Sequence, residues 1–456
     1  MKTINNFLFK QIDNSALIVF RVFFGLLIFL ESVGAIFTGW VKRTLVAPEF
    51  TFSFIGFEWL QPLPGNGMYY YFAIMGLFGF LVMIGYKYRW SMLGFAILWA
   101  GVYFMQKASY NNHYYLLMVL SFVMVLVPAN TYLSVDVLQN PKNKSVKMYN
   151  WQKWLVIGLM TIAYIFGAIN KVYADWLHAI PVQQFMLAKK HYFLIGDILQ
   201  ERWVHYVLSY LGIIFDALIV PALLYKPTRK IAFGLAIFFH LFNSIVFQVG
   251  IFPFLSLAFC LFFFDAKTIR NIFLKKKALY VDNKIELPKN INIIKYGVLL
   301  FFVIQIALPL RHWFIQDNVL WTEEGHRLSW RMMLRTKSGV ISYKVIDKAT
   351  GKSEIIDYRK MVSAKQANML STKPDVIWQF VQRLKAQYKK EGKEIEVYAL
   401  HSKISVNGKK HQPFVDPKID LASVTWSSLK HSDWLLPSLK TEITQESHSF
   451  PKEMKQ

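Results

Sequence analysis

The chain has 456 residues, of which 54% are hydrophobic and 17% aromatic, with a formal net charge of +24 and a mean hydropathy of +0.30. This composition excludes an ordinary soluble enzyme and indicates a polytopic membrane protein with a soluble part. The positive charge falls largely in short loops between apolar runs, which is typical of membrane topology rather than of nucleic-acid binding. Cys260 is the only cysteine, so an internal disulfide, a zinc cluster and a thiol pair are excluded.

Apolar runs in the first two thirds of the chain predict about nine transmembrane helices, with eight as the alternative. The first run follows Lys2 and Lys10 and has no small-residue cleavage site after it, so we expect a membrane helix rather than a signal peptide. Several later runs are short for a spanning helix, and their ends are poorly defined. The runs cover residues 16–37, 68–86, 91–106, 113–129, 154–171, 204–224, 231–249, 251–264 and 295–310.

Basic residues between the runs predict the orientation in the membrane. Clusters within residues 87–89, 142–153 and 226–230 fall on alternate loops, which places these loops and the N-terminus in the cytoplasm. A further cluster at residues 275–277 stays on that side only if residues 231–264 cross twice, as two short helices or with one re-entrant segment. We therefore expect a transmembrane domain over residues 1–310, and the rest of the chain outside the cytoplasm.

Residues 311–456 have the composition of a soluble domain, with 25 basic and 16 acidic residues. Alternation predicts a half-buried strand and a hairpin, and an apolar stripe predicts an amphipathic helix. We therefore predict a β-rich α+β domain that ends in a polar tail after residue 440. The expected elements are a strand at 340–346, a turn at 349–352, a returning strand at 354–358, a helix at 376–388 and a strand pair at 394–406.

The fifth apolar run ends in an unusual place for a charge. It begins near Trp154 and reaches Asn170 and Lys171 without a run of charges that would mark its exit into water. Because burial disfavours the charged form of lysine, this ammonium group must be paired, hydrated in a cavity or deprotonated. A deprotonated lysine is a base, and an ionisable group in a membrane segment indicates function. The alternative is a lysine that marks the helix end and extends to the membrane surface.

Other polar side chains are embedded in the apolar runs, and each carries a desolvation cost. A lone histidine in such a run is most often simply hydrogen-bonded, but so many polar groups together predict a site in the membrane domain. The histidines lack the local spacing of metal ligands, so no metal site is predicted. An alternative function is a transporter that uses Lys171 and Asp175 as a proton-coupled pair. The embedded polar residues are Arg21, Asn111, Asn112, His113, Asp216, His240, Asn243 and Ser244.

Blocks of unusual sequence follow one another within residues 15–440. In the membrane part they are KASYNNHYYL at 107–116, PAN at 128–130, SVD at 134–136, GAINKVYADW at 167–176, FHLFNS at 239–244 and VGIFPF at 249–254. In the soluble part they are LSWRMM at 328–333 and FVDP at 414–417. In this order the blocks resemble the vitamin K-dependent γ-glutamyl carboxylase family.

The resemblance implies a chemistry that needs no metal. Lys171 would be the base that deprotonates a reduced naphthoquinone, vitamin K hydroquinone or menaquinol, to which dioxygen then adds. The oxygenated product would take a γ-proton from a peptide glutamate, and carbon dioxide would capture the carbanion, giving γ-carboxyglutamate and the quinone epoxide. His113 and His240 would orient or stabilise oxyanions. Weaker candidates for contact with the quinone or its oxyanion are Arg21, Asn112 and Asn243.

The resemblance also implies the partners, and the chain departs from the animal members of the family. The partners would be a glutamate-containing peptide or protein, a lipid quinone and the membrane, without nucleic acid. Animal members have a cysteine pair that ties the soluble domain to the membrane part, which Cys260 alone cannot form. The small size and the abundance of Lys, Asn and Ile indicate a bacterial inner or plasma membrane protein. A bacterial member could instead be a quinol epoxidase or oxidoreductase without a peptide substrate.

Overall fold

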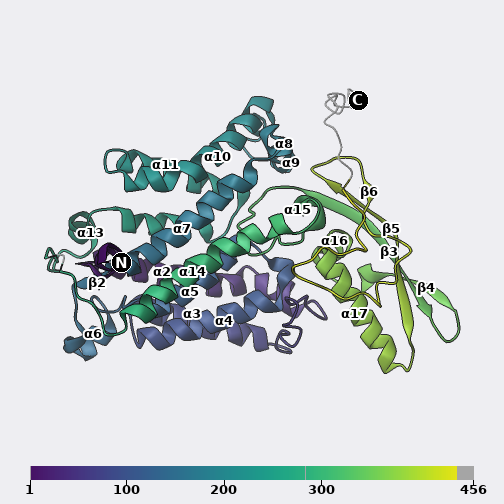
Figure 1. Ribbon diagram of the computed structural model, residues 1–456, viewed down its shortest axis with the longest axis horizontal. Coiled ribbons are helices and arrows are strands. Elements are labelled where there is room, and N and C mark those ends of the chain that lie inside the picture. Colours follow the sequence, from purple (N-terminus) through teal and green to yellow (C-terminus); the bar gives the residue numbers. More distant parts are fainter. Residues whose placement is uncertain (1, 283, 439–456) are drawn as a thin grey trace.

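The computed structural model describes residues 2–282 and 284–438, which form a helical part followed by a smaller part built on a sheet (Figure 1). This confirms the predicted fold class, whereas the predicted tail after residue 440 lies outside the described residues. The helices of the first part are α1 (Lys2–Phe9), α2 (Ser15–Phe37), α3 (Gly67–Ile84), α4 (Tyr88–Met105), α5 (Asn112–Leu126), α6 (Val135–Gln139), α7 (Asn150–Lys171), α8 (Ala174–Leu177), α9 (Ile180–Leu187), α10 (Arg202–Leu224), α11 (Arg229–Phe242), α12 (Phe252–Phe259), α13 (Ala266–Phe273) and α14 (Ile291–Leu310). The second part contains α15 (Val319–Thr322), β3 (Lys337–Asp347), β4 (Ser353–Ile356), α16 (Ala364–Thr372), α17 (Pro374–Lys390), β5 (Ile395–Val406) and β6 (Gln412–Pro413).

Within the described residues, six helices are long and apolar enough to cross a membrane, by length and composition alone. They are α2, α3, α7, α10, α11 with the π-helical turn Asn243–Phe247, and α14 extended to Phe314. The other three predicted runs form α4, α5 and α12. The count of nine crossings therefore stays a prediction.

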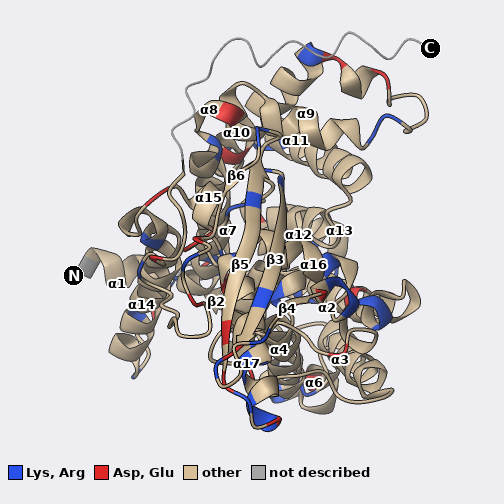
Figure 2. Ribbon diagram, turned by 90° about the vertical axis from the view of Figure 1, so that its right-hand side faces the viewer, with Lys and Arg blue, Asp and Glu red and all other residues tan. Residues whose placement is uncertain are grey.

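Lys and Arg residues recur along β3, β5 and α17 of the second part, as Figure 2 shows.

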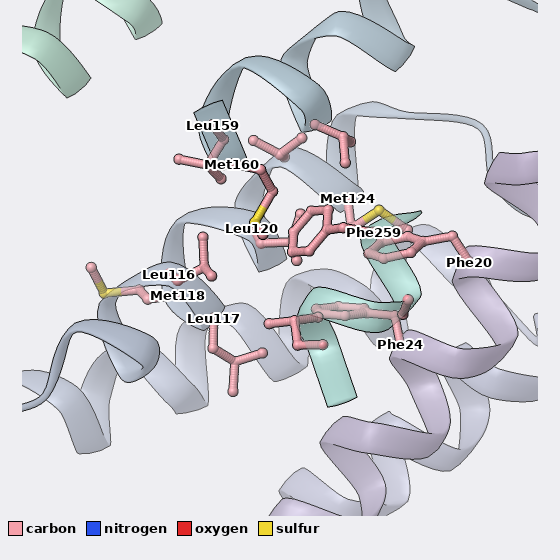
Figure 3. Close-up of a cluster of buried hydrophobic side chains, with 14 of the residues drawn as sticks. Phe20, Phe24, Leu116, Leu117, Met118, Leu120, Met124, Leu159, Met160 and Phe259 are labelled. Atoms are coloured by element: carbon pink, nitrogen blue, oxygen red, sulfur yellow. The ribbon is translucent and has the colours of Figure 1, made fainter. Parts of the chain in front are cut away.

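The core of the helical part lies where α2, α5, α7 and α12 meet (Figure 3). Phe20 of α2 packs on Phe259 of α12 with ring centres 5.3 Å apart, and Met124 of α5 lies beside them. The backbones of α2 and α3 come into contact at Gly25, where a Cβ would lie 2.4 Å from the amide nitrogen of Met83. Only glycine, which has no Cβ, permits this approach, so the close contact between α2 and α3 depends on Gly25.

Residues 231–264 form two helical segments with a reversal between them, and that both segments cross the membrane stays a prediction. The π-helical turn after α11 leads to a reversal at Gln248 and Gly250, both of which have positive φ, before α12 begins. Arg229 Nη1 lies 3.5 Å from Asp265 Oδ1, so the two ends of this hairpin are side by side.

The N-terminus and three of the basic loops, those at residues 87–89, 142–153 and 275–277, gather at the end of the helical part that lies away from the sheet. In Figure 1 the N-terminus, β2, α6 and α13 lie together on the left, and β3 to β6 lie on the right. Strand β1 (Gln11–Asp13) pairs with β2 (Lys147–Tyr149), and the buried ammonium group of Lys277 lies 2.8 Å from Asp13 Oδ2. This arrangement agrees with the prediction that the basic loops and the second part lie on opposite sides of the membrane.

The second part is a four-stranded antiparallel sheet in the order β4-β3-β5-β6, with α16 and α17 packed against it. Strands β3 and β4 form the predicted hairpin, and α17 is the predicted amphipathic helix. The strand pair predicted for residues 394–406 is wrong, because these residues form one strand, β5. His401 has a φ of 51° opposite the register shift between Val340 and Ser342. This bulge interrupts the alternation of buried and exposed residues along β5, so the sequence pattern there resembles that of a turn between two strands.

Contacts in both directions join the two parts. Residues 328–333 enter the helical part, where Trp330 is 1% exposed and its ring centre lies 4.8 Å from that of Tyr115. In the opposite direction, Lys107 of the loop before α5 extends to α17, where its Nζ lies 2.8 Å from Asp375 Oδ2. The second part is therefore held close to the end of α7.

Candidate functional site

The C-terminal end of α7 carries an ion pair inside the apolar part. The ammonium group of Lys171 contacts the Asp216 carboxylate of α10, and the two side chains are 11% and 8% exposed. A Cβ on Gly167 would lie 2.9 Å from Asp216 Oδ2, so this glycine lets the carboxylate approach α7. The Trp176 ring centre lies 5.8 Å from Lys171 Nζ. Of the states expected for Lys171, the structure has the paired one, and the side chain is buried.

His240 of α11 is hydrogen-bonded to Tyr164, which lies two turns before Lys171 on the same face of α7. Tyr164 Oη lies 2.9 Å from His240 Nε2, and both side chains are buried. Among the described residues, His240 Nδ1 has no hydrogen-bond partner. One polar atom of this imidazole therefore remains available in apolar surroundings.

Aromatic rings surround His240 and lead to His113. Phe215 stacks on Phe239 with ring centres 3.7 Å apart, and it meets the His240 ring edge-on at 5.6 Å. Phe252 lies between the two histidines, with its ring centre 5.7 Å from that of His240 and 6.2 Å from that of His113. Both predicted histidines therefore belong to one aromatic cluster, which is carried in part by α7 and α10, the two helices that form the ion pair.

A cavity of about 10 Å³ lies beside this cluster, between α7, α10, α11 and α12. Tyr164, His240, Ser256 and Cys260 line it together with apolar side chains. Within the described part of the chain, Ser256 Oγ and His240 Nδ1 are buried without hydrogen-bond partners. Apolar walls and two unpartnered polar atoms fit a reduced naphthoquinone, an apolar ring with two hydroxyl groups. The cavity has room for about one water, so its walls must separate to admit such a ring.

Asn112 holds the segment that enters from the second part. Its Nδ2 donates to the Arg331 carbonyl at 2.9 Å, and Asn170 Nδ2 donates to the backbone of the same segment at 3.1 Å. Arg331 Nη1 in turn donates to Asn170 Oδ1 at 2.8 Å. The Met332 methyl group lies 3.3 Å from the position of a Cβ on Gly167, so the segment passes beside the ion pair.

Of the other two predicted site residues, Arg21 lies away from this cluster, and Asn243 follows His240 by three residues. The fully buried guanidinium group of Arg21 donates to the carbonyls of Val82, Met83 and Leu133, which fastens α2 to the end of α3 and to the loop after α5. Asn243 is half-buried at the start of the π-helical turn after α11. A role for either residue in quinone binding stays a prediction, and the carbonyl contacts already account for the burial of Arg21.

Asp175 does not pair with Lys171. Its carboxylate accepts a hydrogen bond from Asn407 Nδ2 at 2.9 Å and lies 2.8 Å from Lys409 Nζ, both of which follow β5. Because α7 ends at Lys171 and α8 begins at Ala174, the i, i+4 spacing does not place the two charges on one helix face. The pair invoked for a transporter is therefore wrong.

Comparison with known families matches both parts of the chain. A family model described as the HTTM domain matches residues 9–267, which is more than half of the chain. A model described as the vitamin K-dependent gamma-carboxylase lumenal domain matches residues 290–441. The chain belongs to the vitamin K-dependent γ-carboxylase family. No solved structure matches it.

Membership of the carboxylase family confirms the resemblance seen in the sequence blocks. The structure shows how this member joins its two parts without the cysteine pair of the animal carboxylases. Cys260 is buried near the cavity, and the contacts between the parts are ion pairs such as Lys107–Asp375 and Asp175–Lys409, with the inserted Trp330.

Two residues of this candidate site, Asp216 and Tyr164, were assigned no role from the sequence. Asp216 had a signal in the sequence, because a carboxylate in an apolar run carries the same desolvation cost as Lys171. Tyr164 had none, since a tyrosine in an apolar helix is commonplace, and only the packing of α11 shows its contact with His240.

Proposed function

We propose that this member of the carboxylase family is a peptidyl-glutamate 4-carboxylase, a carbon–carbon lyase. It would oxygenate vitamin K hydroquinone or menaquinol to the epoxide and couple this to the carboxylation of peptide glutamate to γ-carboxyglutamate. The observation that carries the proposal is the Lys171–Asp216 pair, buried in the HTTM-like part beside a segment of the lumenal-type domain.

Lys171 and Asp216 would act as a pair and together accept the proton whose transfer starts the reaction. The pair has a net charge of zero both as ammonium with carboxylate and as amine with carboxylic acid, and it can take up one further proton. It then carries one positive charge beside the anion that the proton has left, and low-dielectric surroundings strengthen this attraction. Asp216 thus supplies the pairing that is one of the three states expected for Lys171 from the sequence.

The aromatic cluster is suited to hold a quinone ring. Phe215, Phe239 and Phe252 supply apolar faces, and His240 Nδ1 and Ser256 Oγ are available for its oxygen atoms. When bound, the reduced naphthoquinone would supply, through its reaction with dioxygen, a base strong enough for the γ-proton of glutamate. The hydrogen bond from Tyr164 would hold the His240 ring in place while its other nitrogen contacts an oxyanion.

The proposed arrangement in the membrane follows from the positions of the two parts. Residues 1–310 would form the catalytic domain in a bacterial plasma membrane. Residues 311–456 would form the substrate-binding domain on the extracytoplasmic side of that membrane. The match to a lumenal domain and the gathering of basic loops at the opposite end of the molecule support this orientation.

The test is mass spectrometry of a glutamate-containing peptide after incubation with the purified protein, vitamin K hydroquinone, dioxygen and ¹³C-bicarbonate as the source of carbon dioxide. We expect a labelled carboxyl group on glutamate and formation of the epoxide in the same reaction. Epoxide without peptide labelling would instead support a quinol epoxidase. If a folded protein formed neither product, both functions would be excluded.

A further inference from the structure

Buried cations gather around a single carboxylate where the second part meets the helical part. Lys373 Nζ lies 2.7 Å from Glu323 Oε2, and Arg335 Nε donates to Glu323 Oε1 at 2.8 Å. Lys337 Nζ lies 3.5 Å from the same carboxylate, whose side chain is 3% exposed. One buried negative charge therefore faces three positive ones.

A second carboxylate in this region is shared in the same way. Asp375 Oδ2 lies 2.8 Å from Lys107 Nζ and 2.5 Å from Arg327 Nη1. Arg331 adds a cation whose Nη1 contacts only the uncharged groups of Asn170 and His312 among the described residues. We call these six groups the cationic strip; when all six are protonated, they leave a surplus of four positive charges over the two carboxylates, and they are Lys107, Arg327, Arg331, Arg335, Lys337 and Lys373.

Burial, and after it repulsion within the cationic strip, lowers the pKa values of two of its members. Burial and the field of Arg335 lower the pKa of Lys373 to about 8, although Glu323 opposes this. Burial and the same guanidinium group lower the pKa of Arg331 to about 10. Buried charges are stable when they are paired, so a strip with this surplus is suited to receive an anion.

Unpartnered donors lie at the inner end of the strip. Within residues 2–282 and 284–438, Arg331 Nε and Trp330 Nε1 have no hydrogen-bond partner, and the two residues are 6% and 1% exposed. Both belong to the segment that passes beside the ion pair of α7 and α10. At the outer end, the side chains of Arg327 and Lys373 are 16% and 19% exposed, so the strip extends from a partly open edge toward that pair.

We propose that the cationic strip binds a carboxylate-type anion, either the side chain of a peptide glutamate or bicarbonate, with Arg331 and Trp330 as its innermost donors. A guanidinium group donates two parallel hydrogen bonds to a planar carboxylate. An indole N–H donates and cannot accept, so this end of the strip selects an anion. The inference rests on the proposed function for the identity of the anion, but binding itself requires neither quinone nor turnover.

The test measures binding to the full chain in lipid nanodiscs by calorimetry, without quinone. The probes are N-acetyl-Leu-Glu-Leu-amide, its Gln counterpart and sodium bicarbonate. We expect the parent to bind the Glu peptide at least about tenfold more tightly than the Gln peptide, and Arg331→Gln to lose this preference, because removal of one partner of a buried charge pair weakens binding strongly. Lys360→Gln, whose side chain is 84% exposed in the same part, is the matched control and should keep the preference.

The bicarbonate probe distinguishes the two sources of the anion. Binding of bicarbonate that depends on Arg331, without a preference for the Glu peptide, assigns the strip to bicarbonate. Because Arg331 also holds Asn170, Lys373→Gln provides a second variant that keeps this contact and should also weaken anion binding. Equal binding of both peptides by the folded parent, together with no binding of bicarbonate, would overturn the inference.

Lys171→Ala separates this inference from the proposed function. That variant should still bind the Glu peptide through the strip and should form no epoxide. A parent protein that binds the Glu peptide but forms neither product would refute the proposed function and leave the carboxylate site standing.

Discussion

Lys171 is the residue on which the proposed chemistry depends most directly. Lys171→Ala should abolish epoxide formation and carboxylation together, because both follow the first proton transfer. A positioned general base contributes roughly 10²- to 10⁴-fold, so we expect a loss of at least that order. Lys171→Arg should do no better, since a guanidinium group keeps its proton at any usable pH. The measurement is the amount of both products in the same sample.

A chemical rescue provides the control for Lys171. Hydroquinone that is already deprotonated at high pH, or a small added amine, should restore part of the activity of Lys171→Ala but not that of Lys171→Arg. If Lys171→Arg folds and forms epoxide at nearly the parental rate, Lys171 is not the base.

Asp216 separates a structural role of the ion pair from a catalytic one. Asp216→Asn leaves a buried lysine without its counter-charge, which should cost about 3–5 kcal/mol of stability. The double variant Lys171→Met with Asp216→Leu removes both charges and should recover most of that stability. Unfolding of the three proteins in detergent, followed by fluorescence, measures the difference. If the double variant is as unstable as Asp216→Asn but still forms epoxide, the pair has neither proposed role.

At the scale of elements, Asp375 joins α17 to the loop before α5. Burial alone would raise its pKa, but Arg327 and Lys107 outweigh burial and lower the pKa to about 2 from an ordinary value of 3.8. A carboxyl group with a lowered pKa in the folded state contributes stability that is complete above about pH 4 and is lost as the pH falls toward about 2. The shift corresponds to about 2 kcal/mol.

The stability of Asp375→Asn should therefore depend on pH in a defined way. The variant should be less stable than the parent at pH 7, and the difference should shrink as the pH falls below about 4. Thermal unfolding of both proteins over a series of pH values measures this. A difference that stays constant down to pH 3 would show that the carboxylate does not hold the two parts together through its charge.

At the scale of the whole molecule, the orientation in the membrane can be tested with single cysteines in a Cys260→Ala background. Lys360→Cys lies on the second part and Lys142→Cys near α6, and both native side chains are exposed. A membrane-impermeant maleimide should label Lys360→Cys from outside intact cells and Lys142→Cys only after the cells are opened. Labelling of both from the same side would contradict the proposed topology.

Properties that depend on a position and its near neighbours were predictable from the sequence. Apolar runs, basic loops and the hairpin of the second part follow from local periodicity and charge. Lys171 was identifiable because the desolvation cost of a charge depends on the hydrophobic run that carries it. The sequence blocks added the family, which the comparisons confirm.

The group with which each buried charge pairs was decided only by the tertiary structure. Lys171 pairs with Asp216, 45 residues away, because Gly167 lets the carboxylate of α10 approach α7. Asp175, four residues from Lys171, turns instead to Lys409 because the helix ends between them. The cost of burying a charge is a local property, whereas the group that offsets this cost is set by helix packing. The sequence by itself therefore determined that Lys171 must be paired, hydrated or deprotonated, and only the fold decided that it pairs with Asp216.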